Sequence, residues 1–272
     1  KEVPAEISAN ALRDVSGKIT GYMVISRDIT ERKRIDHAKS EFVSLTSHQL
    51  RTPLSVLKWY SEMILGEKLG PINNQQRKYM DGIHMVNEQM IKLVNLLLNV
   101  SRVELGTISI IPRPTSVIAV ADSVISEIKP LSDDKKLVIK KDYEKGIPMI
   151  NVDQNIMRII LENIISNAIR YSFVGGEINV SIQKSKSDIV IKVSDRGCGI
   201  PQNQQSQIFT KFFRAENAKD LDATGNGLGL YIVKSVLDQS GGKVWFKSQE
   251  GKGATFFVAV PLGGMKQKEG AK

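Results

Sequence analysis

The chain has 272 residues, enough for two domains with sizeable cores, and its single cysteine excludes a disulfide framework or a multi-cysteine metal site. Its 38 Lys and Arg against 29 Asp and Glu give a formal net charge of +9, but the basic residues are scattered or terminal, which disfavours direct nucleic-acid binding. No apolar run approaches the ~20 residues of a membrane-spanning helix, so we expect a cytoplasmic chain; membrane anchoring would require a segment upstream of this sequence.

Residues Val3–Thr30 predict two strands joined by a turn. The stretch Ala5–Leu12 roughly alternates, Ser16-Gly17 favours a turn, and Ile19–Ile29 forms the second strand. Two strands alone are only marginally stable in water, so we interpret this piece as the end of a larger sheet. Because the first residue is Lys1 rather than Met, we also expect the sequence to be a fragment of a longer chain.

From Glu31 the apolar period becomes helical. A short coiled-coil seam is formed by Ile35, Ala38, Phe42 and Leu45. The helix continues past Pro53, which should kink it, to a break at Gly66–Pro71, and a second helix covers Met80–Val100. An antiparallel helical hairpin buries its apolar stripe poorly by itself, so we predict a homodimer that forms a four-helix bundle.

Beyond Gly106 the pattern becomes mixed. The strand-like stretches are Thr107–Ile111, Leu137–Asp142, Glu177–Lys184, Asp188–Ser194, Gly242–Ser248 and Ala254–Val260. The helical stretches are Val117–Ser132, Asp153–Tyr171 and Gly229–Gln239. The alternation in the strands indicates a sheet with one face on a core, so we predict an α+β sandwich with helices on one side of the sheet.

The first candidate site lies in the first long helix, where His48 and Gln49 come one turn before Thr52 and next to Pro53. Continuing the heptad places Gln49 on the seam and His48 beside it, accessible from outside. A lone histidine on a helix is commonly a surface residue, whereas an exposed imidazole at a kink can serve as a nucleophile. These residues alone do not decide between the two interpretations.

The second candidate site lies on the helix that we expect to begin at the N-cap Asp153. One face of this helix carries Asn163, Asn167, Arg170 and Tyr171. Asparagine is unfavourable in a helix interior, and amide oxygens suit Mg²⁺, which prefers hard oxygen ligands. The pattern therefore favours a ligand-binding face over a merely solvated one.

Three glycine-rich segments follow strands or precede a helix. They are Asp195-Arg196-Gly197-Cys198-Gly199-Ile200, Gly225-Asn226-Gly227-Leu228-Gly229 and Gly251-Lys252-Gly253-Ala254-Thr255. Glycines allow the backbone to approach a ligand closely, and the free N–H groups of a helix N-terminus attract phosphate. The third segment is also consistent with a hairpin turn. The stretch Gln202–Thr224 between the first two is long enough to be a lid.

In order and spacing, these segments resemble a sensor histidine kinase of two-component systems across nearly all of Glu31–Leu262. His48 looks like the phosphoacceptor of the H-box, and Asn163 with Asn167 matches the N-box. Asp195–Gly199 is similar to the G1 box, Phe209–Phe213 to the F-box and Gly225–Gly229 to the G2 box, and Gly251–Thr255 resembles the last glycine motif. Val3–Thr30 is similar to the final strands of a PAS sensor domain.

This resemblance implies a multidomain chain. Residues 1–30 would end a PAS domain and residues 31–41 would form a signalling coiled coil. Residues 42–106 would be an all-α helical hairpin for dimerisation and histidine phosphotransfer. Residues 107–264 would form an α+β sandwich of the Bergerat (GHKL) ATP-binding fold, followed by a basic tail at 265–272.

The resemblance also implies ATP and Mg²⁺ as cofactors. Asp195 would contact the adenine amine, Asn167 would ligate Mg²⁺ with help from Asn163, and Arg170 and Tyr171 would face the phosphates or ribose. The further residues expected at the nucleotide are Gly197, Gly199, Ile200, Phe212, Gly225, Gly227, Leu228, Gly229 and Thr255. His48 would attack the γ-phosphorus, and the phosphoryl group would pass to an aspartate of a response regulator receiver domain.

One position departs from the family pattern, which has an acid after the phosphoacceptor where this chain has Gln49. An amide can orient the imidazole but cannot take its proton, so we expect a slowed autokinase. The alternative is an ATP-binding scaffold or regulator phosphatase with weak autokinase activity. Thr52 matches the family position linked to regulator dephosphorylation, although a threonine beside proline is also ordinary helix structure.

A third function, direct hydrolysis of ATP, is disfavoured by the residues on the helix that carries the N-box. Related ATPases place a glutamate four residues before the metal-binding asparagine, where this chain has Asn163. Glu162 is one position off and therefore rotated by about 100° around the helix.

Overall fold

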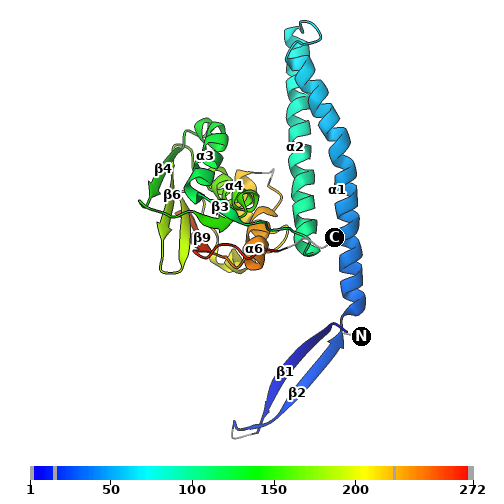
Figure 1. Cartoon of the computed structure of the whole chain (residues 1–272), viewed down its shortest axis with the longest axis vertical. Coiled ribbons are helices and arrows are strands. Elements are labelled where there is room, and N and C mark those ends of the chain that lie inside the picture. The colour runs from blue at the N-terminus through cyan, green and yellow to red at the C-terminus, as the bar shows by residue number, and fades with distance from the viewer. Residues whose placement is uncertain (1–2, 15–16, 223–224, 269–272) are drawn as a thin grey trace. The chain divides into compact units, whose positions relative to one another are not determined.

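The computed structural model describes residues 3–14, 17–222 and 225–268 (Figure 1). The chain divides into two compact units, Lys1–Leu105 and Gly106–Lys272. Three predictions reach beyond the described residues: Ser16 of the first turn, residues 223–224 of the expected lid and residues 269–272 of the basic tail. The two units are described in turn.

The first unit begins with the predicted pair of strands, β1 (Ala5–Arg13) and β2 (Ile19–Asp28). They pair antiparallel, with Ala5 opposite Asp28. The turn brings the N–H of Gly17 to the carbonyl of Asp14 at 2.9 Å, and Gly17 has a φ of +86°, which favours glycine. Side chains on both faces of this ribbon are exposed within the unit.

Two long helices follow, α1 (Thr30–Leu65) and α2 (Asn74–Glu104), and they form the predicted hairpin. Asn73 caps α2 through a capping box with Gln76. The helix α1 is continuous through the boundary expected between residues 41 and 42, and it includes Pro53. The coiled-coil segment and the segment that carries His48 are therefore one helix.

Polar contacts connect the two helices of the hairpin. Asn87 is buried and its Nδ2 donates to the Leu54 carbonyl at 3.0 Å. At the opposite end of the hairpin, Ser40 Oγ donates to Glu104 Oε2 at 2.6 Å. These hydrogen bonds help to hold α1 and α2 against each other, because polar groups removed from water need partners.

The second unit is built on a five-stranded sheet in the order β4-β6-β7-β9-β8. Its strands are β4 (Val138–Tyr143), β6 (Glu177–Lys184), β7 (Asp188–Asp195), β8 (Lys243–Gln249) and β9 (Gly253–Pro261). β4 and β6 are parallel, and the other neighbours are antiparallel.

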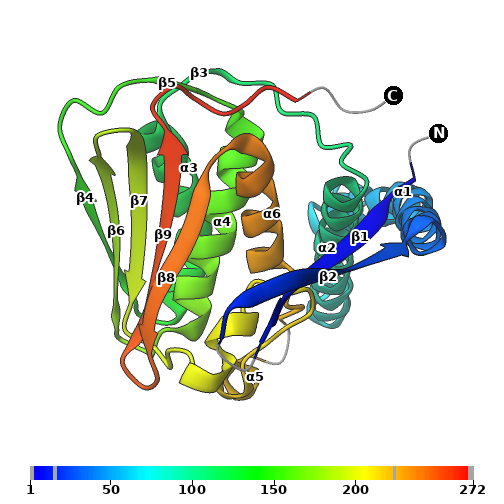
Figure 2. The same ribbon diagram turned by 90° about the horizontal axis from the view of Figure 1, so that it is seen from below.

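Helices cover one face of this sheet (Figure 2). They are α3 (Val117–Asp134), α4 (Gln154–Tyr171) and α6 (Gly229–Ser240). The alternating apolar residues of the strands point toward these helices: Ile178, Val180 and Ile182 of β6 are 0% exposed. The predicted fold, a helical hairpin followed by an α+β sandwich, is confirmed.

The structure corrects the expected strand Thr107–Ile111. Among the described residues no strand forms there, and Ile110 pairs with Lys268 in an isolated bridge. The strand forms further along as β3 (Arg113–Thr115), which pairs antiparallel with β5 (Ile150–Val152). Ile108 and Ile110 are buried side chains, so the alternation in this stretch reflects packing and not a strand.

The segment expected to be a lid also contains short helices. They are a 3₁₀ helix, Gln202–Gln207, and α5 (Glu216–Leu221). Each has six residues, which is too few for a helical apolar period to become visible in the sequence.

Candidate functional site

The helix α4 is anchored at both ends. At its start, Asp153 is the predicted N-cap: Oδ1 accepts from the N–H groups of Asn155 (2.9 Å) and Ile156 (3.1 Å). At its end, Lys135 Nζ donates to the carbonyls of Ile169 and Arg170. A cation at a helix C-terminus pairs with carbonyls that have no partner within the helix, and it interacts favourably with the helix dipole. The polar face between these ends is therefore held in a fixed position.

The two asparagines on that face differ in what they contact. Asn163 Nδ2 donates to the Ile159 carbonyl at 2.7 Å. Its Oδ1 lies against Gly229, where an added Cβ would come within 2.4 Å. Asn167 is half-buried, and within the described part of the chain its side chain makes no hydrogen bond. Of the expected metal ligands, Asn167 has an amide oxygen available for an ion, whereas Asn163 joins α4 to α6.

Asp195 ends β7 with its carboxylate buried. Its side chain sits beneath the turn between β8 and β9, and Oδ1 accepts from the Ala254 N–H at 3.2 Å. Burial raises the pKa of Asp195 to about 6, although hydrogen bonds from the Ala254 and Gly197 backbone oppose the rise. A buried carboxylate that is mostly ionised at neutral pH is an acceptor suited to a ligand's amino group.

The loop after Asp195 meets the end of α4 through glycine. An added Cβ at Gly197 would lie 2.0 Å from the Tyr171 carbonyl oxygen, and that oxygen accepts from the Cys198 N–H at 3.1 Å. Gly199 has a φ of +59° and packs against Gln249 in the same way. These contacts bring Asp195 next to the turn that carries Arg170 and Tyr171, and a larger residue at Gly197 would force them apart.

The N-terminus of α6 contributes free backbone groups. Within the described residues, no side chain caps this helix. The first N–H groups of such a helix can bind a phosphate. The N–H of Leu228 is used by Asn226 Oδ1 at 3.1 Å, and the Leu228 side chain is 1% exposed. Gly227 has a φ of +68° and packs on the backbone of Phe212, whose own φ is +61°. The Phe212 side chain is exposed.

Two of the other expected residues occupy supporting positions. Ile200 donates its N–H to Ser248 Oγ at 2.9 Å. Gly225 lies against the guanidinium of Arg214, which an added Cβ would approach to 3.2 Å. Both residues therefore shape the loops that surround the site.

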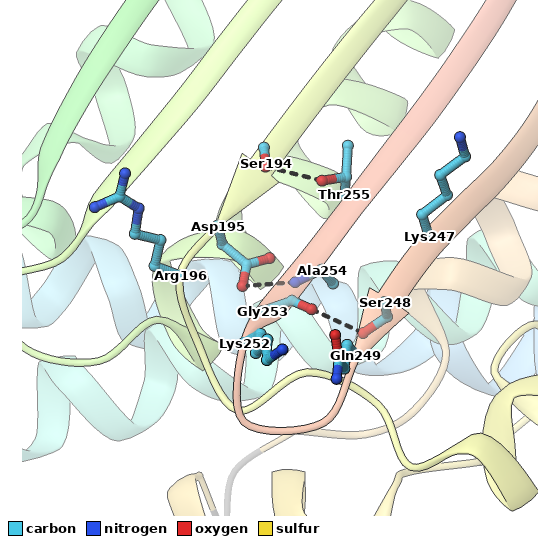
Figure 3. Close-up of a pocket in the computed structure, with 10 residues that line it drawn as sticks. All are labelled: Ser194, Asp195, Arg196, Lys247, Ser248, Gln249, Lys252, Gly253, Ala254 and Thr255. Atoms are coloured by element: carbon cyan, nitrogen blue, oxygen red, sulfur yellow. Dashed lines mark hydrogen bonds between the residues drawn. The ribbon is translucent and has the colours of Figure 1, made fainter.

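Thr255, another of the residues expected at the nucleotide, lies on β9. Its Oγ1 hydrogen-bonds Ser194 Oγ at 2.8 Å, and it lies opposite Ser194 in β7 and Lys247 in β8 (Figure 3). Directly opposed residues share a face of a sheet, and the buried neighbours Val193 and Phe256 occupy the helix-covered face. Thr255 is therefore on the open face. In this motif the backbone N–H of Ala254 is the group that meets Asp195.

A hollow of about 470 Å³ adjoins Asp195 at this end of the sheet (Figure 3). Besides Ser194 and Thr255, its lining includes the cationic residues Arg196, Lys247 and Lys252.

Three residues around α5 that the sequence analysis did not single out make contacts here. Asn217 Nδ2 donates to the carbonyls of Cys198 and Gly199, both at 3.1 Å. Arg214 Nη2 donates to the Ala218 carbonyl at 3.2 Å and to that of Asp222. Asp222 in turn pairs with Arg170. Asn217 and Asp222 contact partners that are remote in sequence, so the sequence carried no signal for these two residues.

His48, Gln49 and Thr52 lie together on α1, in the other unit. All three are exposed there, and within the described residues their side chains make no hydrogen bond or ion pair. Ser47, the residue before it, is buried, whereas the side chain of His48 is accessible. The imidazole is thus presented as a group that a second reactant can reach.

No group of three or more His, Cys, Asp or Glu side chains among the described residues is arranged to hold a metal ion. No helix in this part of the chain is both long and apolar enough to cross a bilayer.

Two family models match the chain. The model for the His Kinase A (phospho-acceptor) domain matches residues 38–106. The model for the histidine kinase-, DNA gyrase B- and HSP90-like ATPase matches residues 152–264. The first match contains His48, and the second contains Asn167, Asp195 and all three glycine-rich segments.

Sequence relatives extend this likeness. The sensor protein SrrB of Staphylococcus aureus is 31% identical over 248 residues, which cover 90% of this chain and 42% of SrrB. The SrrB sequence of the MRSA252 strain is 31% identical over 249 residues, again with 42% of the relative covered. The chain therefore spans less than half the length of the curated relatives that it matches.

Solved structures share the fold. Full-length ShkA, crystallised in complex with AMPPNP, aligns with a TM-score of 0.68 and 23% identity over 84% of this chain and 46% of ShkA. The histidine kinase AdeS of Acinetobacter baumannii aligns with a TM-score of 0.55 and 23% identity over 79% of this chain and 98% of that one.

Proposed function

This chain belongs to the sensor histidine kinases of two-component systems, and we propose that it transfers the γ-phosphoryl group of ATP to His48. The observation that carries the proposal is that α4, the helix of Asn167, contacts the loop after the buried Asp195 at Gly197 and the start of α6 at Gly229. This arrangement supports a nucleotide base at Asp195 and metal-bound phosphates near Asn167.

In the proposed nucleotide complex, Asp195 accepts a hydrogen bond from the adenine amino group. The backbone approaches the ligand at Gly197 and Gly199, and the uncapped start of α6 at Gly229 offers N–H groups to phosphate. Arg170 and Tyr171, in the last turn of α4, face the phosphates or ribose.

The amide oxygen of Asn167 fits Mg²⁺, because a hard oxygen ligand with no competing hydrogen bond is available at the site. When bound with ATP, the ion offsets negative charge on the phosphates. Asn163 supports this arrangement through its contact with Gly229. As a direct ligand Asn163 is at a disadvantage, because its Oδ1, the atom that would bind the ion, lies against Gly229.

In the proposed reaction, Nε2 of His48 forms a bond to the γ-phosphorus while the bond from that phosphorus to the bridging oxygen of ADP breaks. The imidazole Nδ1 proton must then leave. Gln49 can accept a hydrogen bond from this proton but cannot remove it, so water takes it. General-base assistance is typically worth about 10²–10⁴-fold, so this chain should phosphorylate itself slowly.

We propose that an aspartate of a response regulator receiver domain receives the phosphoryl group, and that two copies of the hairpin form a four-helix bundle. Residues 1–30 would be the last strands of a PAS domain, and Thr52 would position water for regulator dephosphorylation. Gln49 also supports a second candidate function, an ATP-binding scaffold or regulator phosphatase with weak autokinase activity.

The test is single-turnover autophosphorylation with γ-labelled ATP and Mg²⁺. The parent should acquire label, His48→Ala should acquire none, and Gln49→Glu should react faster by ~10²-fold or more. An unchanged rate in Gln49→Glu would contradict the role assigned to the missing acid. Tight ATP binding without label in the parent would favour the scaffold or phosphatase instead.

A further inference from the structure

An ion pair joins the end of α4 to the segment that follows α5. Arg170 Nε lies 3.0 Å from Asp222 Oδ2. The Asp222 side chain is only 14% exposed, against 40% for Arg170. Among the described residues, Asp222 supplies the one carboxylate in an ion pair with Arg170. The guanidinium proposed to face the nucleotide phosphates or ribose is therefore already paired with a carboxylate.

The position of Asp222 is also set by contacts independent of Arg170. Its carbonyl accepts from Arg214 Nη2, which holds the Ala218 carbonyl as well. The same short helix is tied to the loop after Asp195 through Asn217. The side chains of Arg214 and Asn217 thus help to hold Asp222 beside Arg170, in addition to the ion pair.

A carboxylate and a phosphate compete for one guanidinium, because both bind the same planar set of N–H donors and both neutralise its charge. We propose that Asp222 is a specificity-determining residue: its carboxylate occupies Arg170 in place of a nucleotide phosphate and must be displaced when the phosphate chain binds. This inference rests on the proposed function. It assigns to Asp222 control over how strongly the site prefers ATP to adenosine.

The competition has a structural consequence. When phosphate takes Arg170, the carboxylate of Asp222 loses its ion pair with that guanidinium and is repelled by the incoming charge. Adenosine leaves the ion pair in place.

Isothermal titration of the full chain with ATP, ADP and adenosine, in the presence of Mg²⁺, tests the proposal. Asp222→Asn should bind ATP about three- to tenfold more tightly than the parent does, since it frees a partly exposed guanidinium. Its affinity for adenosine should not change, because adenosine has no phosphate. The gain for ATP should shrink as salt rises.

Asp220→Asn is the matched control. It removes the same charge two residues away, within α5, but Asp220 is exposed and makes no ion pair within the described part of the chain. It should change ATP affinity by less than about twofold. A double-mutant cycle with Arg170→Met adds a second control, because the gain from Asp222→Asn should vanish when Arg170 is absent.

Three results would overturn the inference: ATP affinity in Asp222→Asn that is unchanged or weaker, an equal gain for adenosine, or a gain that survives in Arg170→Met. Asp222→Ala repeats the test with a side chain that offers no hydrogen bond. A parent that binds neither ATP nor adenosine would refute the proposed function, and the inference with it. A parent that binds both, without a selective gain in either Asp222 variant, would refute only the role of Asp222.

Discussion

The two units cover their apolar side chains to very different degrees. In the α/β unit, large side chains of α4 and the sheet, such as Ile160, Ile165 and Ile178, are 0% exposed. In the hairpin unit, Phe42 is 69% exposed and Trp59 is 56% exposed, although both lie on a long regular helix. The α/β unit thus buries its own core, whereas the hairpin leaves large apolar groups in contact with water.

The proposed four-helix bundle would account for this contrast. Burying one large apolar side chain contributes about 1.5–3 kcal/mol, and the exposed groups of α1 and α2 forgo that contribution in a single chain. A second copy of the hairpin would cover them. The residues proposed to bind the nucleotide, in contrast, all belong to the α/β unit.

The largest expected effect is the loss of stability when a core side chain of the α/β unit is truncated. Ile165→Ala should lower the free energy of unfolding of that unit by about 4 kcal/mol, because it removes a fully buried side chain and leaves a cavity. The measurement is urea unfolding followed by circular dichroism. Val86→Ala in the exposed part of α2 is the control and should change the stability of the α/β unit by less than about 0.5 kcal/mol. Similar losses in both variants would contradict the contrast.

The second effect is the loss of folding stability when the buried carboxylate of Asp195 ionises. A rise of the Asp195 pKa from its ordinary 3.8 to about 6 corresponds to about 3 kcal/mol of destabilisation at pH above 6. The raised pKa means that stability is fully present below pH 3.8 and is lost as pH rises toward 6. Asp195→Asn should remove this loss, so the unliganded variant should be more stable than the parent at pH 7.5 while losing ATP affinity.

Thermal unfolding of both proteins between pH 4 and pH 8, together with ATP titration, measures this effect. The stability difference should be largest at high pH and should disappear near pH 4. A variant that is less stable than the parent at pH 7.5 would show that the carboxylate supports the fold and does not strain it.

The third effect is a dependence of the hairpin's stability on protein concentration. If the hairpin is completed by a second copy, each tenfold dilution should destabilise it by about 1.4 kcal/mol of dimer, while the α/β unit should be unaffected. Scanning calorimetry at several protein concentrations separates the two transitions. A hairpin transition that does not move with concentration would argue against the dimer.

The smallest effect lies on the surface of the hairpin. Lys58 Nζ is 2.9 Å from Glu88 Oε1, and this lysine lowers the pKa of Glu88. A lowered pKa gives stability that is present above the ordinary value of 4.5 and is lost as pH falls below it. Glu88→Gln should cost about 0.2–1 kcal/mol at neutral pH and nothing at low pH. Glu62→Gln, whose carboxylate is 3.8 Å from the same lysine, is the control and should cost less.

The sequence predicted those parts of the fold that repeat with a regular period. The alternation at Ile189, Ile191 and Val193 correctly placed β7, and the spacing of Asn163 and Asn167 correctly placed the polar face of α4. The short strands β3 and β5 have three residues each and show no period, so they were missed.

The site was predictable only in part, for a physical reason. The N-cap Asp153 acts on the residues next to it, so it could be assigned from local sequence. Lys135, Asn217 and Asp222 act on carbonyls or charges that are remote in sequence, and only folding brings these groups together. The close approach of Gly197 to the Tyr171 carbonyl is equally remote, so the glycine was visible in the sequence but its partner was not.

The central claim is that ATP bound to the α/β unit donates its γ-phosphoryl group to His48 of the hairpin. The most direct measurement is the position and chemical stability of the label after reaction with γ-labelled ATP, by peptide mapping of the product. We expect acid-labile, alkali-stable label on the peptide that contains His48, and its loss in Asn167→Ala although that variant remains folded. Label on another residue, or release of phosphate without any labelled protein, would contradict the claim.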